Sequence, residues 1–400
     1  MACMETSTNT SRPLPRIDYA DFAIALATGW ILALCAVFFI AVLFSGKMAG
    51  TRDFVSYWAT GVQLRHHSDP YDYDQMMAIE RAAHLDAKGV LFMRNPPWAL
   101  PLAYPLGFVE LRICAFMWNL ILLACLLTSV HLVRVMHGSP NNYVHWLGVA
   151  FTPAVICLGM GQTGLFTLLG MVLFLRFNRT HPFAAGLALW FCTLKPHLLL
   201  PFGVALLVWI VLRRSYRILA GWSLAMAVST ALAWWLDPQA WARYSAMMRT
   251  NQVQFEFVPT LSDALRFRIN PQWIWLQYVP AAVACVWALV YFWRRRSTWD
   301  WMENGSPLLL VSVLVAPYCF PPDQCLVIPA VLHGMYKTRS RVLLALLAII
   351  LVAAQIETWK VRTISGYYMW LAPTWLIWYL LARRSTGSEE AIPAPAATQA

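Results

Sequence analysis

The stretch Thr51–Asp74, TRDFVSYWATGVQLRHHSDPYDYD, is the first polar interval after the first long apolar run of the chain. Charge is scarce elsewhere, yet this interval contains four aspartates, at positions 53, 69, 72 and 74. Asp53 follows the apolar run by about two helical turns, counted at 3.6 residues per turn. Tyr57 and Gly61 continue a helical spacing, which predicts a short helix over 54–65 on a membrane surface.

The four carboxylates have both structural and chemical interpretations. An ionisable group near a membrane interface is a functional candidate, and Asp53 could act as a general base toward a hydroxyl group. The alternative is a helix N-cap, because Asp53 opens the predicted helix. Asp69 precedes a proline and is typical of a turn, while Asp72 and Asp74 can cap a following helix over 75–88.

The composition places this stretch at a membrane. Of the 400 residues, 60% are hydrophobic and 12% are charged, and a soluble domain normally has about twice that charged fraction. A net charge of +11 could indicate nucleic-acid binding. However, the basic residues form short clusters between apolar runs, which membrane orientation explains better. We therefore predict an all-α polytopic membrane protein with no nucleic-acid partner.

The apolar runs predict about twelve membrane spans. They are expected over residues 20–44, 110–134, 143–160, 162–178, 182–194, 196–212, 217–236, 272–293, 305–319, 323–336, 340–356 and 366–383. Several are shorter than the roughly 20 residues that cross a bilayer, so some are candidates for half-helices or joined pairs. A single transmembrane domain is thus expected over 20–384, between disordered tails at 1–19 and 385–400.

Basic clusters in every second interval between the spans predict the orientation. Arginines recur there, for example at 213–217 and 294–296, and the positive-inside rule assigns these intervals to the cytoplasm. Both termini are then cytoplasmic. The opposite intervals contain most of the unusual polar residues, including the loop 46–109. An active or binding face is therefore expected on the extracytoplasmic side.

Four further breaks on that face carry candidate functional residues. They are Arg94 before Asn-Pro-Pro, Gln162 after Gly161, the triplet Lys195-Pro196-His197, and Asp323 after two prolines. The Lys195 ammonium beside an imidazole could hold a phosphate group, and the guanidinium of Arg94 binds phosphate well. Each residue also has a structural alternative. Lys195 can snorkel to the interface, Gln162 can sit in a tight turn, and Asp323 can cap a helix.

Six segments occur in an order that is informative as a whole. They are DFVSYWATGVQL, DPYDYDQM, RNPPWALPLAYPLG, GMGQTGLFTLLGMVLFL, AAGLALWFCTLKPHLLL and APYCFPPDQCLVIPAVL. The pattern resembles glycosyltransferase family 87 over roughly residues 20–380. The members of that family are bacterial integral-membrane enzymes of the GT-C type that use polyprenyl-phosphate sugars, with mannose in the best-known members.

The resemblance implies a catalytic aspartate at Asp53, because Asp-Phe followed by Tyr57 matches the family's context. The family's Pro-Tyr-Asp turn matches Tyr71 and Asp72. Its Gly-Gln and Lys-Pro breaks match Gln162 and Lys195. The implied reaction is an inverting hexosyl transfer in which Asp53 deprotonates the acceptor hydroxyl.

In that reaction Lys195 would hold the leaving lipid phosphate, with His197 or Arg94. Tyr57, Tyr71, Asp72, Gln162 and Asp323 are the implied substrate-binding residues. The family often has a His or Tyr shortly before the late aspartate, whereas two prolines precede Asp323 here. No cofactor is implied beyond the donor lipid, and no tight acidic cluster demands a metal.

The expected partners are a lipid-linked sugar donor, a glycolipid or glycan acceptor and membrane lipid, in the bacterial plasma (inner) membrane. The alternative is a transporter or flippase of lipid-linked glycan. The sequence shows no inverted repeat and few ionisable residues at mid-membrane depth, which disfavours that class. A third alternative is a membrane glycan polymerase or ligase, which usually has one large outer loop late in the chain. Here the first outer loop contains most of the candidate functional residues instead.

Overall fold

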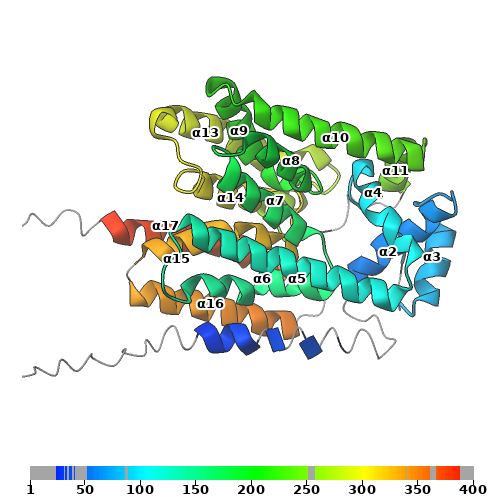
Figure 1. Ribbon diagram of the computed structural model, residues 1–400, viewed down its shortest axis with the longest axis horizontal. Helices are drawn as coiled ribbons and strands as arrows, with labels where there is room; N and C mark the ends of the chain where they lie inside the picture. Colours follow the sequence, from blue (N-terminus) through cyan, green and yellow to red (C-terminus); the bar gives the residue numbers. More distant parts are fainter. Residues whose placement is uncertain are drawn as a thin grey trace, which may run out of the picture.

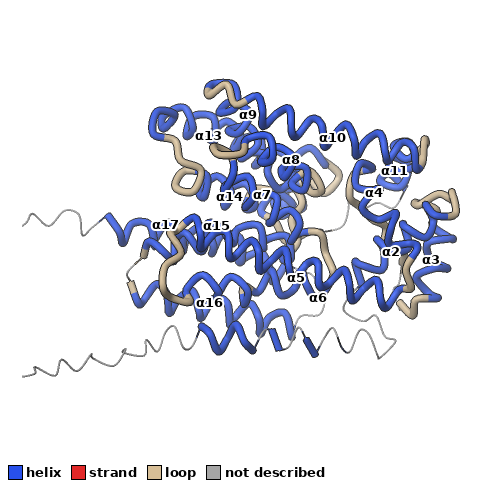
Figure 2. Tube along the Cα trace, in the orientation of Figure 1, coloured by secondary structure: helices blue, strands red, loops and turns tan. Residues whose placement is uncertain are grey.

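The computed structural model describes residues 24–30, 32–33, 36–37, 40, 52–85, 89–250, 257–338, 340–360 and 366–387. Helix accounts for 79% of the structure, and the described residues contain no strand, so the predicted all-α class is confirmed. Figure 2 shows these helices joined by short loops. The predicted span 20–44 lies mostly outside the described residues. So do both tails, except for residues 385–387, which end the last helix.

The described helices follow one another closely along the chain. The α-helices are α2 (Arg52–Arg65), α3 (Tyr73–Ala82), α4 (Leu100–Ala103), α5 (Leu111–Met136), α6 (Thr152–Met160), α7 (Gly164–Phe177), α8 (Pro182–Cys192), α9 (Leu200–Leu212), α10 (Tyr216–Leu236), α11 (Ala240–Thr250), α12 (Leu261–Ile269), α13 (Val279–Arg295), α14 (Gly305–Leu314), α15 (Ile328–Lys337), α16 (Arg341–Lys360) and α17 (Leu371–Gly387). The 3₁₀ helices are η1 (Pro97–Ala99), η2 (Tyr104–Phe108), η3 (Val144–Ala150), η4 (Pro196–Leu199), η6 (Ile274–Tyr278), η7 (Arg296–Thr298), η8 (Pro321–Val327) and η9 (Gly366–Trp370).

Four of the described helices are long and apolar enough to cross a membrane. They cover Leu111–Met136, Tyr216–Leu236, Ile274–Thr298 and Arg341–Thr358. Each coincides with a predicted span. The longest, α5, begins cleanly because the carboxylate of Glu110 accepts hydrogen bonds from the first backbone N–H groups, at 3.0 and 3.1 Å. Such a cap satisfies donors that no helical carbonyl can reach.

Shorter apolar helices form at four other predicted spans. They cover Gly164–Phe177, Pro182–Cys192, Pro196–Leu212 and Gly305–Leu314. The predicted spans 143–160 and 323–336 are each divided, because η3 precedes the nine-residue α6 and η8 precedes the ten-residue α15. Every residue from Pro321 to Met335 is buried, so this segment lies inside the protein.

Helices α10, α8, α7 and α5 pack in that order, so α7 and α8 lie between two of the long helices (Figure 1). The α8–α10 contact is the closest of these. A Cβ atom on Gly186 would collide with the Ile218 carbonyl, and one on Gly221 would collide with the Phe183 carbonyl. Glycines therefore let the two helices meet backbone to backbone, as small residues do in membrane helix pairs.

The first polar loop forms a compact unit at one end of the molecule, where α2, α3, α4 and α11 gather (Figure 1). The predicted helix over 54–65 is present as α2. It is buried along most of its length, with Phe54 and Val55 fully enclosed. This differs from the surface position expected of it. The reason is that α4 and η2 pack against Gly61, where a Cβ atom would collide with the Ala103 carbonyl of α4 and the Gly107 backbone nitrogen of η2.

Candidate functional site

Gly161 and Gln162 form the break between α6 and α7. Gly161 ends α6 with a φ of +69°, a left-handed conformation that favours glycine. A Cβ atom there would also lie 2.7 Å from the Cβ of Phe54, the residue next to Asp53. The indole of Trp118 donates a hydrogen bond to the Gly161 carbonyl at 2.8 Å. The turn is thereby fixed against the start of α2, where Asp53 lies.

Lys195 lies in the break between α8 and η4. The proline that follows it begins η4, and the Lys195 carbonyl accepts a hydrogen bond from the N–H of Leu198 at 3.2 Å. The lysine side chain is only 13% exposed. A charge buried to this degree needs a partner, because removing an ammonium from water is costly.

Asp323 provides that partner from the first turn of η8. One oxygen of its carboxylate pairs with the Lys195 ammonium. The other accepts a hydrogen bond from the backbone N–H of Phe320 at 2.9 Å. The carboxylate therefore caps the start of η8, as the structural alternative predicted, and also makes an ion pair with Lys195.

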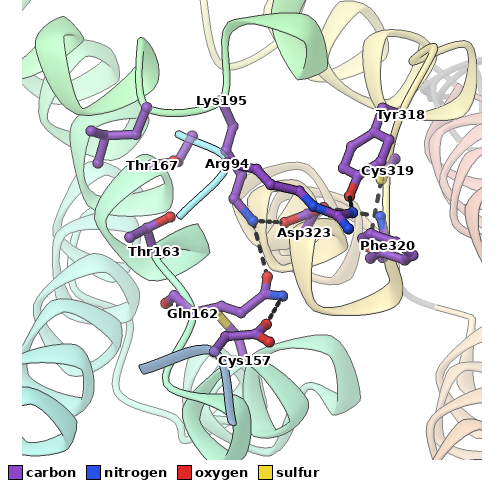
Figure 3. Close-up of polar contacts among 12 residues, drawn as sticks. Arg94, Cys157, Gln162, Thr163, Thr167, Lys195, Tyr318, Cys319, Phe320 and Asp323 are labelled. Carbon is purple, nitrogen blue, oxygen red and sulfur yellow. Dashed lines mark hydrogen bonds and ion pairs between the residues drawn. The ribbon is translucent and has the colours of Figure 1, made fainter. Parts of the chain in front are cut away.

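A continuous chain of polar contacts joins these breaks to the first loop (Figure 3). The Lys195 ammonium donates to the side-chain carbonyl of Gln162 at 2.9 Å. The amide nitrogen of the same glutamine donates to the Asp53 carboxylate. We call the sequence Asp53–Gln162–Lys195–Asp323 the polar chain. Four residues that are far apart in the sequence therefore meet, and Gln162 separates the Asp53 carboxylate from the ammonium.

Electrostatics keep the lysine of the polar chain charged. Burial alone would lower the pKa of Lys195, but the adjacent carboxylate of Asp323 outweighs that effect and raises it. Nearby, burial raises the pKa of Tyr57 well above its ordinary value, so its phenol stays neutral. The Tyr57 ring also packs against Trp118 with ring centroids 5.7 Å apart. Tyr57 therefore lines the polar chain as a neutral hydroxyl.

Arg94, Lys195 and Asp323 all lie near Tyr318 (Figure 3). The Arg94 guanidinium donates to the Tyr318 hydroxyl at 3.1 Å, and the Arg94 carbonyl accepts from the Tyr244 hydroxyl at 3.1 Å. The two tyrosines thus hold Arg94 in place through their hydroxyl groups.

His197 contacts the same tyrosine, Tyr318, directly. Its ring meets the ring of Tyr318 edge-on, with centroids 5.5 Å apart. Its Nε2 atom is buried and has no hydrogen-bond partner within the described residues. A buried nitrogen without a partner is unusual in folded proteins and indicates a place for a ligand or an ordered water.

Two predicted site residues, Tyr71 and Asp72, lie beyond the other end of α2 from Asp53. The Asp72 carboxylate accepts from the N–H of Gln75 at 2.8 Å and caps α3. The ring of Tyr71 meets the ring of Tyr244, with centroids 5.8 Å apart. Tyr71 thus supports a tyrosine that holds Arg94. None of the described contacts joins Asp72 to the polar chain.

The site also contains residues that the sequence analysis did not select as functional. The Asn95 amide donates to the Leu194 carbonyl at 2.9 Å and lies 3.4 Å from the Thr163 hydroxyl. It therefore ties the first loop to both polar breaks. Tyr318 and Tyr244 likewise hold Arg94. The only signal for Asn95 in the sequence was its place beside Arg94, before two prolines.

A second group of polar side chains, here called the histidine cluster, lies at the far end of α5. The His137 ring contacts the rings of His145 at 2.7 Å and His333 at 3.0 Å, nitrogen to nitrogen. His333 then contacts the Glu303 carboxylate at 3.3 Å, and Lys337 pairs with the same carboxylate at 2.5 Å. Helix α5, of 26 residues, separates this cluster from Trp118 and the polar chain by roughly 27 Å at 1.5 Å per residue for 18 residues.

The comparisons with known proteins give one match. The family model of glycosyltransferase family 87 matches residues 92–317, which is more than half of the chain. Comparison with curated protein sequences and with solved structures finds no match. The matched region contains Arg94, Gln162, Lys195 and His197, whereas Asp53 and Asp323 lie on either side of it.

Proposed function

The chain belongs to glycosyltransferase family 87, and from this premise we propose that it transfers mannose from a polyprenyl-phosphate donor to a hydroxyl group of a glycolipid or glycan. Family membership and the apolar helices make it a membrane glycosyltransferase. The proposal includes a GT-C type fold with about twelve spans. It also includes a site on the extracytoplasmic face of the plasma membrane, in keeping with the alternating basic clusters.

The observation that carries the proposal is the polar chain itself. It brings a carboxylate, Asp53, and a buried ammonium, Lys195, to the two ends of one glutamine side chain. Glycosyl transfer from a lipid phosphate needs a base for the acceptor and a cation for the leaving group. Lys195 follows the end of the apolar helix α8, where a lipid-linked donor would present its phosphate.

In the proposed reaction, Asp53 removes the proton from the acceptor hydroxyl while its oxygen attacks the anomeric carbon of the sugar. The bond between that carbon and the phosphate oxygen breaks, and the phosphate leaves with the electron pair. The configuration of the sugar inverts because attack and departure occur on opposite faces. The phosphate needs no proton from a second carboxylic acid, unlike the leaving group in glycoside hydrolysis.

Negative charge grows on the phosphate oxygens as the bond breaks. Lys195 and Arg94 are the cations assigned to that charge, and the unpartnered Nε2 of His197 is assigned as a further contact. Asp323 keeps Lys195 protonated and fixed. Tyr57 and Gln162 are assigned to the sugar and to the orientation of Asp53. Tyr71 and Asp72 remain predicted substrate contacts.

Gln162 has a further purpose in this scheme. If Lys195 paired directly with Asp53, the ion pair would hold the carboxylate in its ionised form and weaken it as a base. The amide of Gln162 separates the two charges by one side chain while fixing both. The geometry therefore allows a base and a cation to work side by side without neutralising each other.

The test compares purified wild-type protein and Asp53→Asn in liposomes that contain a panel of polyprenyl-phosphate sugars. We expect consumption of the mannosyl donor by the wild type and a loss of about 10³-fold in the variant, in the range of a missing general base. Asp74→Asn is the matched control, because it removes an exposed carboxylate of the same loop. Equal turnover in wild type and Asp53→Asn would remove Asp53 from the mechanism. Movement of lipid-linked glycan without turnover would favour a transporter.

A further inference from the structure

A pocket of about 780 Å³ opens at the end of α7, α8 and α9 that is remote from Lys195. Helix α7 begins beside Gln162 and ends at the pocket, so its 14 residues place the two sites roughly 20 Å apart at 1.5 Å per residue. The pocket is lined by Asn178, Arg179, Pro182, Trp209, Arg213, Arg214, Ser215, Arg217, Ser297, Thr298, Trp299 and Asp300. We call it the arginine pocket.

The lining of the arginine pocket is strongly positive. It contains four arginines and one aspartate, a formal charge of +3. The aspartate, Asp300, lies 3.6 Å from Arg179 across an exposed contact. Asp300 is also occupied by the backbone, because its carboxylate accepts from the N–H groups of Met302 and Glu303 at 2.8 and 3.1 Å. The pocket is therefore suited to an anion.

Two polar atoms of the lining residues are buried without a described hydrogen-bond partner. Trp299 is 3% exposed, yet its indole N–H has no hydrogen-bond partner within the described part of the chain. The side-chain oxygen of Asn178 is likewise buried without a described partner. In addition, α8 and α10 both begin at the pocket, at Pro182 and just after Ser215. The partial positive charge of helix N-termini favours an anion there.

The rim of the pocket indicates where that anion comes from. Val211, Leu212 and Tyr216 are exposed on the helices that form the pocket. Apolar side chains beside arginines at the ends of membrane helices are suited to a molecule with a charged headgroup and acyl chains. A basic pocket between membrane helices is a known type of site for anionic lipid headgroups. A soluble phosphate compound would not need the apolar rim.

We propose that the arginine pocket binds the phosphate-bearing headgroup of an anionic phospholipid. The phosphate lies against Arg214 and Arg217 at the start of α10, and the acyl chains run along the exposed residues of α9. This site is separate from the polar chain, so lipid binding there is independent of which sugar is transferred.

The test measures lipid binding to the delipidated, purified full chain by native mass spectrometry. Phosphatidylglycerol is compared with phosphatidylcholine of the same acyl chains, and with soluble glycerol phosphate. We expect Arg214→Gln with Arg217→Gln to weaken phosphatidylglycerol binding about 25-fold, since each basic residue near an anionic lipid contributes about fivefold. The matched control, Arg294→Gln with Arg384→Gln, removes the same charge outside the pocket and should change binding less than about twofold.

Three outcomes would overturn the proposal. Equal weakening in the pocket variant and in the control would mean that diffuse basic charge binds the lipid. Equal binding of phosphatidylcholine would mean that the headgroup charge is not recognised. Binding of glycerol phosphate as tight as that of phosphatidylglycerol, and lost in the pocket variant, would assign the pocket to a soluble phosphate compound.

Discussion

Two polar regions lie at opposite ends of α7, α8 and α9, and they hold their charges in opposite ways. In the polar chain, Lys195 is 13% exposed and pairs with Asp323, which is 1% exposed. In the arginine pocket, Arg179 is 66% exposed and arginines outnumber acids. A buried charge must be paired and is therefore fixed in position. An exposed charge is solvated by water and can exchange that water for a ligand. Burial thus separates the region suited to chemistry from the region suited to binding.

The largest expected effect is at Lys195. We expect Lys195→Met to lower turnover by about 10³-fold, because the leaving phosphate loses a positioned cation. It should also destabilise the protein by about 3–5 kcal/mol, because Asp323 is left buried and unpaired. Arg217→Met, the same kind of change in the arginine pocket, should alter neither quantity by much. Turnover with a polyprenyl-phosphate sugar and thermal unfolding in detergent measure both effects.

A double variant separates the two effects of Lys195. In Lys195→Met with Asp323→Asn, neither position of this pair carries a charge, and the asparagine oxygen can still accept the N–H of Phe320. Stability should largely return while turnover stays low. If turnover returned together with stability, Lys195 would have only a structural role. The polar chain would then not differ from the arginine pocket in being suited to chemistry.

The next effect concerns the glutamine that joins the charges. We expect Gln162→Ala to reduce kcat by about 10–100-fold, because a loss of about 1 Å in positioning can cost this much. Gln63→Ala is the matched control, since Gln63 is also buried on the first-loop side but lies at the other end of α2 from Asp53. Steady-state kinetics on both variants provide the measurement. An equal fall in kcat for both would indicate general loosening of α2.

A smaller effect is expected at Asp72, a predicted substrate contact that the structure places as a helix cap. Asp72→Ala should lower the free energy of unfolding by about 1 kcal/mol, the usual cost of losing an N-cap. Turnover should stay within about threefold of wild type, well below the loss of a catalytic base. A rise in KM at unchanged stability would instead support the predicted contact between Asp72 and the substrate. Unfolding curves and substrate titrations decide between these results.

The smallest effect is a pH dependence of stability at the end that carries the histidine cluster. Burial, followed by His333 and His145, lowers the pKa of His137 from 6.5 to about 3. Below pH 6.5, His137 is protonated in the unfolded chain, but in the folded chain it is protonated only near pH 3. The free energy of unfolding therefore falls across this window as the pH drops. Hydrogen bonding from His333 lowers the pKa of Glu303 from 4.5 to about 2, which adds a loss below pH 4.5.

After allowance for partial solvent exposure, we expect about 1 kcal/mol to be lost through His137 between pH 7 and pH 5. His137→Phe keeps a ring to stack on Tyr336 and removes the titrating group. The slope of the unfolding midpoint against pH should therefore become flatter in this variant. An unchanged slope would show that His137 does not titrate on unfolding.

The sequence predicted much of the site because helix ends are visible in it. Gln162, Lys195 and Asp323 each interrupt an apolar run beside glycine or proline, and alternating basic clusters assigned all three to one face. Residues at one end of neighbouring helices must lie near one another. Helix α2 was also predictable, because its spacing from Asp53 is helical.

Other features depend on how segments pack, and the sequence does not show them. Tyr318 reaches Arg94 across 224 positions, and their contact requires the loop before η8 to approach the first loop. The short spans were recognised as candidates for half-helices, but which of them divide into a 3₁₀ and a short α segment was not predicted, because a buried broken run has the same hydropathy as a span. The arginine clusters were visible, but the concave shape that gathers them was not.

The close backbone contact between α8 and α10 at Gly186 and Gly221 determines which mutations inactivate the protein. These two positions carry no chemical group, yet a single methyl on either would strike a carbonyl of the facing helix. The crossing joins α10 to α8, which begins at the arginine pocket and ends three residues before Lys195. A genetic screen for inactive chains should therefore recover substitutions at these glycines as often as at Lys195, although they touch neither sugar nor lipid.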